Sequence, residues 1–455
     1  MLARGLAEFA ASLKPDAIPP EVIERATACI LDCLGAALAG SSTALAQGLL
    51  QMIEQEGGHQ EATLIGRGGR ATMRQTVLYN GAIAHALDYD DVSWSMNGHP
   101  SVTLVPPVLA IGERFGRAGR ELLTAFVVGL ELEGKLGAAV NPDLYRRGWH
   151  ATAVLGTLGA ALASARLLAL DVGATTHALG IAASLAAGLR ENFGTMTKPL
   201  HAGRAGESGV AAALLARAGL TASAQALDGP FGFTQVFSEG VDAEKVLAVL
   251  GRPFELVHPG VVFKRFPSCA GTHPALDAVL ALAVEFDLRA ADVELVECAT
   301  DLQTRDMLIY PEPRTGLEGK FSMPFCVAVA LRDRRLGLAD FTEDKVRDPD
   351  LAEVMRRVRL TVDPELERSG YLSRSATTVT IRLRDGPALA RRVDLARGNP
   401  ENPLSREELV EKFRDCARTV LPPARIQACL EQVLALDRLP DLTSLVALLA
   451  PGQES

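Results

Sequence analysis

The sequence predicts a mainly α-helical protein, with a large all-helical domain and a smaller inserted α+β domain. Helical periodicity runs through most of the first 265 residues, where Ala and Gly often recur three or four residues apart. Segments rich in β-branched residues occur mostly further on, and helical patterns return from about residue 400. We therefore expect both chain ends to form one domain (1–265 and 400–455) around the inserted domain (266–399).

The helices of the first domain are predicted from apolar periodicity and from signals at their ends. The helix at 20–40 is the clearest, because Pro20 opens it, Glu21 lies in its first turn and Gly40 ends it. Residues 61–72 are strand-like, with glycines that mark a turn. Other helices are expected at 3–13, 43–56, 71–90, 101–116, 119–137, 150–168, 173–188 and 204–218.

The inserted domain is predicted from β-branched content and partial alternation. Strands are expected at 293–300, 357–362, 376–383 and 390–396, with helices near 317–331 and 350–356. Helical periodicity then resumes at Ser405, which forms a capping-box pattern with Glu408. Two further helices, near 422–435 and 441–449, complete the predicted helical domain.

Composition restricts the kinds of partner. The net charge of −9 and the absence of a Lys/Arg run argue against nucleic acid or an anionic membrane as the main partner. The N-terminal segment lacks the apolar region of a signal peptide, and the apolar run at 151–170 contains Arg166 and small residues typical of a buried helix. The seven cysteines show no CxxC or zinc-type spacing. We expect a cytoplasmic protein that does not interact with membranes.

The segment 80–101 begins as an apolar, helix-compatible run and ends with Asp88, Asp90, Asp91 and His99. Burying a carboxylate or an imidazole without a partner costs on the order of several kcal/mol, because the group loses its hydration. This concentration of ionisable groups predicts one wall of an active site.

The geometry of that wall depends on where the helix ends. On a continuous helix Asp88 shares a face with His85, whereas Asp90 points nearly the opposite way, so the carboxylates would not face one ligand. A solvated helix end, in which Asp90 or Asp91 caps the next helix, remains an alternative for those two residues. A magnesium–diphosphate site would need a second acidic cluster, which the sequence lacks.

Three histidines stand at predicted helix openings in Gly- or Pro-rich turns: His99, His150 and His273. The dipole at a helix N-terminus disfavours a protonated imidazole and favours a bound anion. Because three such histidines occur together, we predict that they act in function.

Cations provide the complementary half of the predicted site. Lys198 lies in a turn before a proline, Lys264 precedes Phe-Pro, and Arg190 follows an apolar helix. Together with Arg204 they suit a small substrate with two or three carboxylates. An exposed position remains an alternative for Arg204.

The sequence predicts neither a cofactor nor a metal ion. No GxGxxG after a strand, no Walker sequence and no GxSxG occur. The remaining inventory of Asp, His and Lys fits metal-free proton transfer beside a carboxylate. β-Elimination, decarboxylation and epimerisation are all compatible with these residues.

Several segments resemble the MmgE/PrpD family, which includes 2-methylcitrate dehydratase, cis-aconitate decarboxylase and iminodisuccinate epimerase. They occur in family order as NGAIAHALDYDD…GHPS, GWHATAVLGTLGAALASARLLAL, NFGTMTKPLHAGRAGESG, KRFPSCAGTHPALDA and PRTGLEGKFSMPF. The resemblance covers most of residues 20–330. It implies a helical domain from both chain ends, an inserted α+β lid and a homodimer.

The resemblance also implies roles for individual residues. Its motifs give a catalytic set of Asp88, His99, His150, Lys198 and His273, with Lys264 as a substrate-binding lysine. In this hypothesis His99 and His150 move protons, and Asp88 orients or polarises one of them. Lys198 and Lys264 bind substrate carboxylates, and His273 donates to the substrate or serves as the second acid/base.

Departures from the family pattern bear on the reaction. Met307 stands where the decarboxylase branch has an active-site tyrosine, and Tyr310 is nearby as a candidate for substrate binding. The segment GLRENFGTMTKPLHAG is more similar to the epimerase and its relatives than to 2-methylcitrate dehydratase.

We therefore predict a lyase or isomerase that abstracts a proton next to a carboxylate of a small di- or tricarboxylic acid. A 2-methylcitrate dehydratase-like hydro-lyase is the first hypothesis, and an epimerase of an iminodisuccinate-like dicarboxylate is the second. A non-catalytic carboxylate-binding or scaffold protein is the alternative of a different class.

Overall fold

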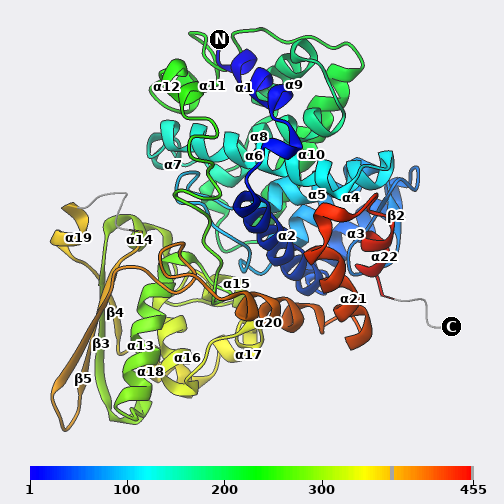
Figure 1. Ribbon diagram of the computed structural model, residues 1–455. Helices are drawn as coiled ribbons and strands as arrows, with labels where there is room; N and C mark the ends of the chain where they lie inside the picture. Colours follow the sequence, from blue (N-terminus) through cyan, green and yellow to red (C-terminus); the bar gives the residue numbers. More distant parts are fainter. Residues whose placement is uncertain (369–373, 452–455) are drawn as a thin grey trace.

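The larger part of the protein consists of helices from the N-terminal half, joined by the helices at the C-terminus (Figure 1). The computed structural model describes residues 1–368 and 374–451. The helices of the N-terminal half are α1 (Leu2–Ser12), α2 (Pro20–Gly40), α3 (Ala44–Glu56), α4 (Met73–His85), α5 (Ser101–Phe115), α6 (Gly119–Val140), α7 (Asp143–Arg146), α8 (Ala151–Leu167), α9 (Val172–Leu185), α10 (Thr197–Arg217), α11 (Phe233–Phe237) and α12 (Ala243–Ala248). A short antiparallel pair, β1 (Ala62–Thr63) and β2 (Arg70–Ala71), lies between α3 and α4.

The mixed part contains a four-stranded sheet in the order β4-β3-β5-β6. Its strands are β3 (Val293–Thr300), β4 (Val358–Val362), β5 (Thr377–Leu383) and β6 (Ala388–Val393). Its helices are α13 (His273–Glu285), α14 (Leu302–Met307), α15 (Gly316–Gly319), α16 (Met323–Asp333), α17 (Glu343–Val346), α18 (Pro349–Met355) and α19 (Pro364–Arg368). Strand β3 pairs parallel with β4 and antiparallel with β5, and α13 and α16 pack on the sheet.

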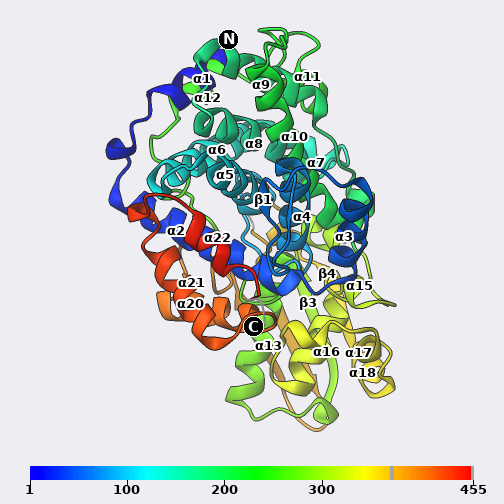
Figure 2. The same ribbon diagram turned by 90° about the vertical axis from the view of Figure 1, so that its right-hand side faces the viewer.

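The C-terminal helices return to the first part of the chain. Helices α20 (Arg406–Ala417) and α21 (Pro423–Leu434) pack on α2, and α22 (Thr443–Leu448) contacts α5. Figures 1 and 2 both show α20 to α22, coloured orange to red, beside the blue α2. The mainly helical fold with a small sheet is confirmed. We propose that the predicted boundaries near residues 265 and 400 separate the two domains.

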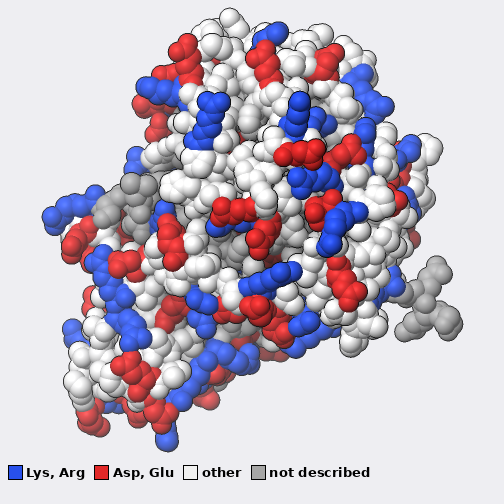
Figure 3. All heavy atoms as spheres, in the orientation of Figure 1, with Lys and Arg blue, Asp and Glu red and all other residues white. Residues whose placement is uncertain are grey.

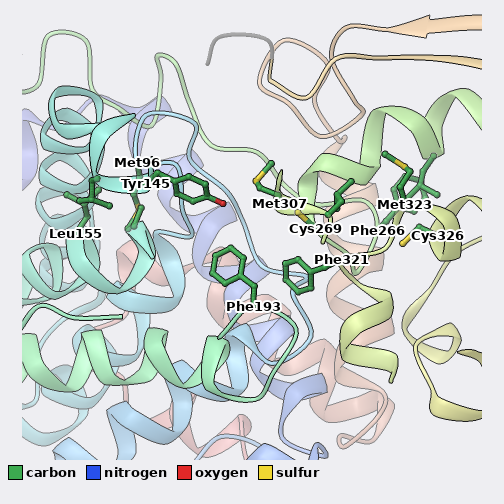
Figure 4. Close-up of a cluster of buried hydrophobic side chains, with 14 of the residues drawn as sticks. Met96, Tyr145, Leu155, Phe193, Phe266, Cys269, Met307, Phe321, Met323 and Cys326 are labelled. Atoms are coloured by element: carbon green, nitrogen blue, oxygen red, sulfur yellow. The ribbon is translucent and has the colours of Figure 1, made fainter. Parts of the chain in front are cut away.

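A cluster of buried apolar side chains extends from the helices into the mixed part. It includes Leu155 and Tyr145 on one side and Phe266 and Phe325 on the other. Figure 4 shows labelled members of this cluster where the two parts meet, with Phe193 near the centre of the view. The two parts therefore share a continuous apolar contact, and the candidate site described below lies beside it.

The structure corrects the predicted helix limits at two functionally important places. The helix expected at 71–90 ends at His85, and Asp88 adopts a left-handed conformation (φ 51°), which Asp tolerates better than most residues. The helix expected from residue 204 begins at Thr197, and Pro199 lies in its first turn, where proline's missing N–H costs no helical bond. The short helices α7, α11 and α12 had no predicted counterpart.

Local capping explains two of the correctly predicted starts. Thr72 and Gln75 form a complete capping box at the start of α4. Ser405 and Glu408 form the predicted one at the start of α20. Each box satisfies backbone N–H groups that a helix leaves unpaired at its first turn.

On the face in Figure 3, acidic and basic side chains are interspersed and form no large patch of one sign.

Within the described part of the chain, no single helix is both long and apolar enough to cross a membrane. Helices α2 and α3 together have sufficient length and apolar composition, but a bend of 82° separates them.

Small residues allow α10 to cross α8 closely. A Cβ atom added to Gly209 would lie 2.5 Å from the Cβ of Ala160 and 2.6 Å from the backbone N of Ala161. We expect Gly209→Ala to lower the free energy of unfolding by about 1–3 kcal/mol, because overpacking forces the helices apart. Urea denaturation measures the change. The control is Gly48→Ala on exposed α3, where no heavy atom lies within 4 Å; it should be neutral or stabilising by up to about 1 kcal/mol. Equal effects of both substitutions would contradict the proposed close packing.

Candidate active site

The turn after α4 brings acidic side chains to one place. Because the helix ends at His85 and the chain turns through Asp88, Asp88 and Asp90 do not diverge as they would on a continuous helix. The solvated alternative for Asp90 and Asp91 is wrong, since both side chains are fully buried. Asp91 does contact the next helix as that alternative predicted, accepting a hydrogen bond from the backbone N–H of Ser101, the first residue of α5.

Asp88 is held between two lysines. The Nζ of Lys198 contacts Asp88 Oδ1, and the Nζ of Lys264 donates to Asp88 Oδ2 and to the Asp88 carbonyl oxygen, at 2.9 Å each. Burial raises the pKa of Asp88, but the two ammonium groups outweigh it and hold the pKa well below its usual range. The carboxylate is therefore ionised, and all three side chains are buried.

Asp90 contacts two histidines. The Nδ1 atoms of His85 and His99 each lie 2.9 Å from Asp90 Oδ2. Burial raises the pKa of Asp90, but the two histidines lower it further, to well below the usual range. An ionised carboxylate only accepts hydrogen bonds, so a neutral imidazole facing it carries its proton on Nδ1 and leaves Nε2 as a proton acceptor.

This contact bears on the prediction that Asp88 orients or polarises a histidine. The Nε2 of His99 is 3.8 Å from Asp88 Oδ1, beyond hydrogen-bond distance, whereas Asp90 is the closer carboxylate. Asp90 is therefore placed to fix the orientation of His99, and Asp88 is placed to pair with lysines.

A second histidine pair adjoins the first. His150, immediately before α8, has its Nδ1 atom 3.1 Å from Nδ1 of His201, which lies on α10. The rings of His150 and His85 are stacked, with centroids 6.0 Å apart. Four imidazoles, from His85, His99, His150 and His201, thus form a continuous group next to the Asp88–lysine cluster.

These imidazoles are neutral near pH 7. Burial lowers the pKa of His85 to about 3 and that of His201 to about 4, and it lowers the pKa of His150 well below its usual value. For His99 burial also dominates, so its pKa falls although Asp90 opposes the change. Neutral imidazoles can accept protons, which the protonated form cannot.

Aromatic side chains cover the lysine side of the site. The Lys198 Nζ lies 5.4 Å from the ring centroid of Phe193 and 5.0 Å from that of Phe321. Figure 4 shows both rings where the helical and mixed parts meet. Phe193 also lines a pocket of about 420 Å³ together with Arg190, Met307 and Ile309.

Three other predicted site residues, Arg190, Tyr310 and His273, make contacts of their own. Arg190 stacks on the Tyr145 ring, with its guanidinium carbon 3.7 Å from the centroid, and it lines the pocket. The Tyr310 hydroxyl donates to the carbonyl oxygen of Phe193 at 2.8 Å. His273 is buried against Phe266, its Nε2 is 3.3 Å from the carbonyl oxygen of Ser268, and burial lowers its pKa to about 3.

Arg204 does not join the cluster, which corrects its predicted role in substrate binding. It lies on α10, is largely exposed, and pairs with Glu207, which also contacts Arg74. The exposed alternative for Arg204 is the one that the structure supports. Its position follows from the earlier start of α10, which makes this residue part of a helix and not of a turn.

The sequence reasoning missed several residues that contribute to the cluster. Asp90, His85 and His201 were seen in the motifs but received no role, and Lys320 was not considered. Asp90 and His85 lie in the same HALDYDD motif as Asp88, and His201 follows Lys198 in KPLH. A predicted helix end at His85 would have indicated that Asp90 and His85 lie together in the site.

Folding also brings together four potential metal ligands that the sequence spacing did not indicate. Ligand atoms of His85, Asp88, Asp90 and His99 all lie within 4.8 Å of one another. However, Lys198 and Lys264 contact the two carboxylate oxygens of Asp88. Because these ammonium groups would repel a divalent cation bound there, the cluster is better suited to an organic anion.

Because the buried histidines are neutral, we expect the folded protein to lose stability in acid. Substitution of His273 allows this effect to be measured. Its folded-state pKa of about 3 lies below the value of about 6.5 in unfolded chains. Below pH 6.5 the unfolded state therefore gains a proton that the folded state does not, and stability falls by about 1.4 kcal/mol per pH unit for this residue. We expect urea unfolding of His273→Asn between pH 6.5 and 5 to show a slope smaller by about this amount. His59→Asn, in the exposed loop after α3, is the control for the effect of the substitution itself. Identical slopes for His273→Asn and the wild type would contradict the prediction.

Comparisons with known proteins agree with this site. Sequence models of the MmgE/PrpD N-terminal and C-terminal domains match residues 4–245 and 266–436. Cis-aconitate decarboxylase from Homo sapiens is 32% identical over 96% of this chain and 92% of its own length, and the enzyme from Mus musculus is 30% identical over 96% and 91%. Cis-aconitate decarboxylase from Aspergillus terreus is 28% identical over 98% of this chain and 95% of its own length. The protein therefore belongs to the MmgE/PrpD family and is an enzyme of the lyase type found in it.

Proposed function

We propose that the enzyme is a metal- and cofactor-free lyase that moves a proton at the carbon next to a carboxylate of a small tricarboxylic or dicarboxylic acid. The observation that carries this proposal is the buried Asp88–Lys198–Lys264 cluster beside four neutral imidazoles. It combines a place for anionic groups with proton acceptors that are uncharged at neutral pH.

The lysines have donors left for a substrate. An ammonium group carries three N–H donors. In the described contacts Lys264 uses two of them on Asp88, and Lys198 uses one. The remaining donors support binding of a substrate carboxylate, and the buried setting strengthens this electrostatic attraction relative to water. Arg190 at the pocket is the candidate partner for a second carboxylate.

Proton transfer is assigned to His99 and His150. With Nδ1 facing Asp90, His99 has Nε2 available as a base for the proton next to the substrate carboxylate. Negative charge that develops on that carboxylate is stabilised by Lys198 and Lys264. His150, which shares a proton with His201, is the candidate acid for the leaving group. His273 remains the alternative second acid/base.

For the net reaction, loss of water from a 2-methylcitrate-like hydroxy acid is the first candidate. In it, His99 removes the proton and becomes an imidazolium, and this proton, relayed through the adjoining imidazoles to His150, leaves on the departing hydroxyl as water. Decarboxylation is the second candidate, favoured by the names of the relatives. In it, loss of CO₂ leaves a carbanion that is protonated by an imidazolium, and that imidazolium has taken its proton from solvent. Two observations argue against decarboxylation. Met307 stands at the position of the decarboxylase tyrosine, and the Tyr310 hydroxyl already donates to the Phe193 carbonyl oxygen.

Epimerisation of an iminodisuccinate-like dicarboxylate is the third candidate, because proton removal and return at one carbon need the same groups. The non-catalytic alternative is set aside, since the relatives are enzymes. A homodimer and a cytoplasmic location remain predictions, and sedimentation measures the first of these.

Proton NMR in deuterated buffer with a chelator separates the candidates. The panel contains 2-methylcitrate, citrate, cis-aconitate and freshly prepared iminodisuccinate. An olefinic product from a hydroxy acid identifies a dehydratase, loss of CO₂ from cis-aconitate identifies a decarboxylase, and deuterium uptake without net change identifies an epimerase. Activity that is lost with chelator and restored by a divalent metal would overturn the metal-free proposal.

The proton-transfer assignment is tested by His150→Asn. An amide cannot exchange a proton at neutral pH, so we expect turnover of the accepted substrate to fall by about 10²–10⁴-fold, the typical contribution of a general acid or base. The change should appear mainly in kcat. His59→Asn is the matched control and should keep wild-type kinetics. Turnover by His150→Asn within a factor of two of the wild type would rule out this role for His150.

A further inference from the structure

Three lysines donate to three successive carbonyl oxygens in the turn that carries Asp88. Lys320 Nζ lies 2.7 Å from the Leu87 oxygen, Lys264 Nζ lies 2.9 Å from the Asp88 oxygen, and Lys412 Nζ lies 2.7 Å from the Tyr89 oxygen. All three lysine side chains are buried.

The three lysines come from separate regions of the chain. Lys264 lies just before α13, Lys320 follows α15 in the mixed part, and Lys412 lies on the C-terminal helix α20. Lys412 also pairs with buried Asp32 of α2 at 2.7 Å. Contacts from all three regions therefore meet at this one turn.

These contacts meet a physical requirement of the turn. A buried carbonyl without a donor costs free energy comparable to a lost hydrogen bond, and the turn has left the helix that would have paired its backbone. Asp88 also holds a left-handed conformation, which persists only where the surroundings determine it strongly. The ammonium groups pair the carbonyl oxygens and hold Asp88 in its left-handed conformation.

Lys320 differs from the other two lysines because it joins two site-bearing segments. Besides the Leu87 oxygen it contacts the carbonyl oxygen of Pro267, also at 2.7 Å. Pro267 lies in the segment between Lys264 and His273, whereas Leu87 directly precedes Asp88. Lys320 thus connects the turn with Asp88 and Asp90 to the segment with Lys264 and His273.

We propose that Lys320 is a positioning residue that fixes these two segments relative to each other. Catalysis then requires that the mixed part packs on the helices. The role rests on the proposed function for its kinetic readout. It is distinct from substrate binding, because the two hydrogen bonds of Lys320 go to backbone oxygens and its Nζ also lies 4.1 Å from the centroid of the Phe341 ring. Without it, the turn with Asp88 and Asp90 shifts relative to the segment with Lys264 and His273.

The contact tolerates a change in the protonation of Lys320. Burial lowers the pKa of its ammonium to about 7. The protonated form has three N–H donors and the neutral amine has two, and the two carbonyl acceptors match either form. The connection therefore persists on both sides of neutral pH.

The test compares Lys320→Met, Lys320→Gln and Lys320→Arg with the wild type. We expect Lys320→Met to lower kcat by about 100-fold, the effect of a displacement of about 1 Å in a catalytic group, and to change KM by less than about threefold. The glutamine side chain is too short to reach both carbonyls, so Lys320→Gln should lose most of the activity too. The guanidinium of arginine can donate to two acceptors, so Lys320→Arg should recover part of kcat. Lys245→Met, at an exposed lysine of α12, is the matched control.

A second readout does not depend on turnover. Imidazole N–H protons of His85 and His99 that face Asp90 should give low-field proton NMR signals in the wild type, and these signals should shift or broaden in Lys320→Met and Lys320→Gln. Wild-type signals together with wild-type kcat in either variant would overturn the proposal, and Lys320→Gln decides if Lys320→Met does not fold. Should the wild type turn over no panel substrate, the proposed function fails, while the NMR signals still test the positioning role.

Discussion

The contact of one buried carboxylate with two ammonium groups governs the arrangement of the site. Asp88 would be costly to bury alone, and so would Lys198 and Lys264. Removing one partner from such a buried group typically costs about 3–5 kcal/mol, because the remaining charges lose their compensation. The three residues come from the turn after α4, from α10 and from the segment before α13. Their pairing therefore brings together three segments that are far apart in the sequence.

The interruption of α4 makes this contact possible. A helix continued to residue 90 would have directed Asp88 and Asp90 to opposite sides. The turn instead gives the two carboxylates different partners, lysines for Asp88 and histidines for Asp90. Backbone oxygens freed by the turn are paired by lysines from three regions, so the conformation of the turn and the docking of those regions depend on each other.

Burial then sets the chemical state of the site. The carboxylates stay ionised because cations or imidazoles face them, whereas the imidazoles stay neutral because desolvation outweighs the nearby carboxylates. Ionised acids, ammonium groups and neutral bases thus coexist at one pH within a few ångströms. This combination is what general acid–base chemistry on a carboxylate substrate needs, and it comes from the environment and not from the residue types alone.

The sequence by itself determined the helical class, the order and approximate limits of most elements, the short inserted sheet and the family. Periodicity, caps and motif order are local signals, and local physics decides them. It also predicted Asp88, His99, His150 and Lys198 as site residues, because each lies in a motif at an element boundary. Only the tertiary structure decided that Asp90 and not Asp88 faces His99, that Arg204 is exposed, and that Lys320 connects two segments. These depend on a left-handed turn and on contacts between residues more than a hundred positions apart, which no sequence period records.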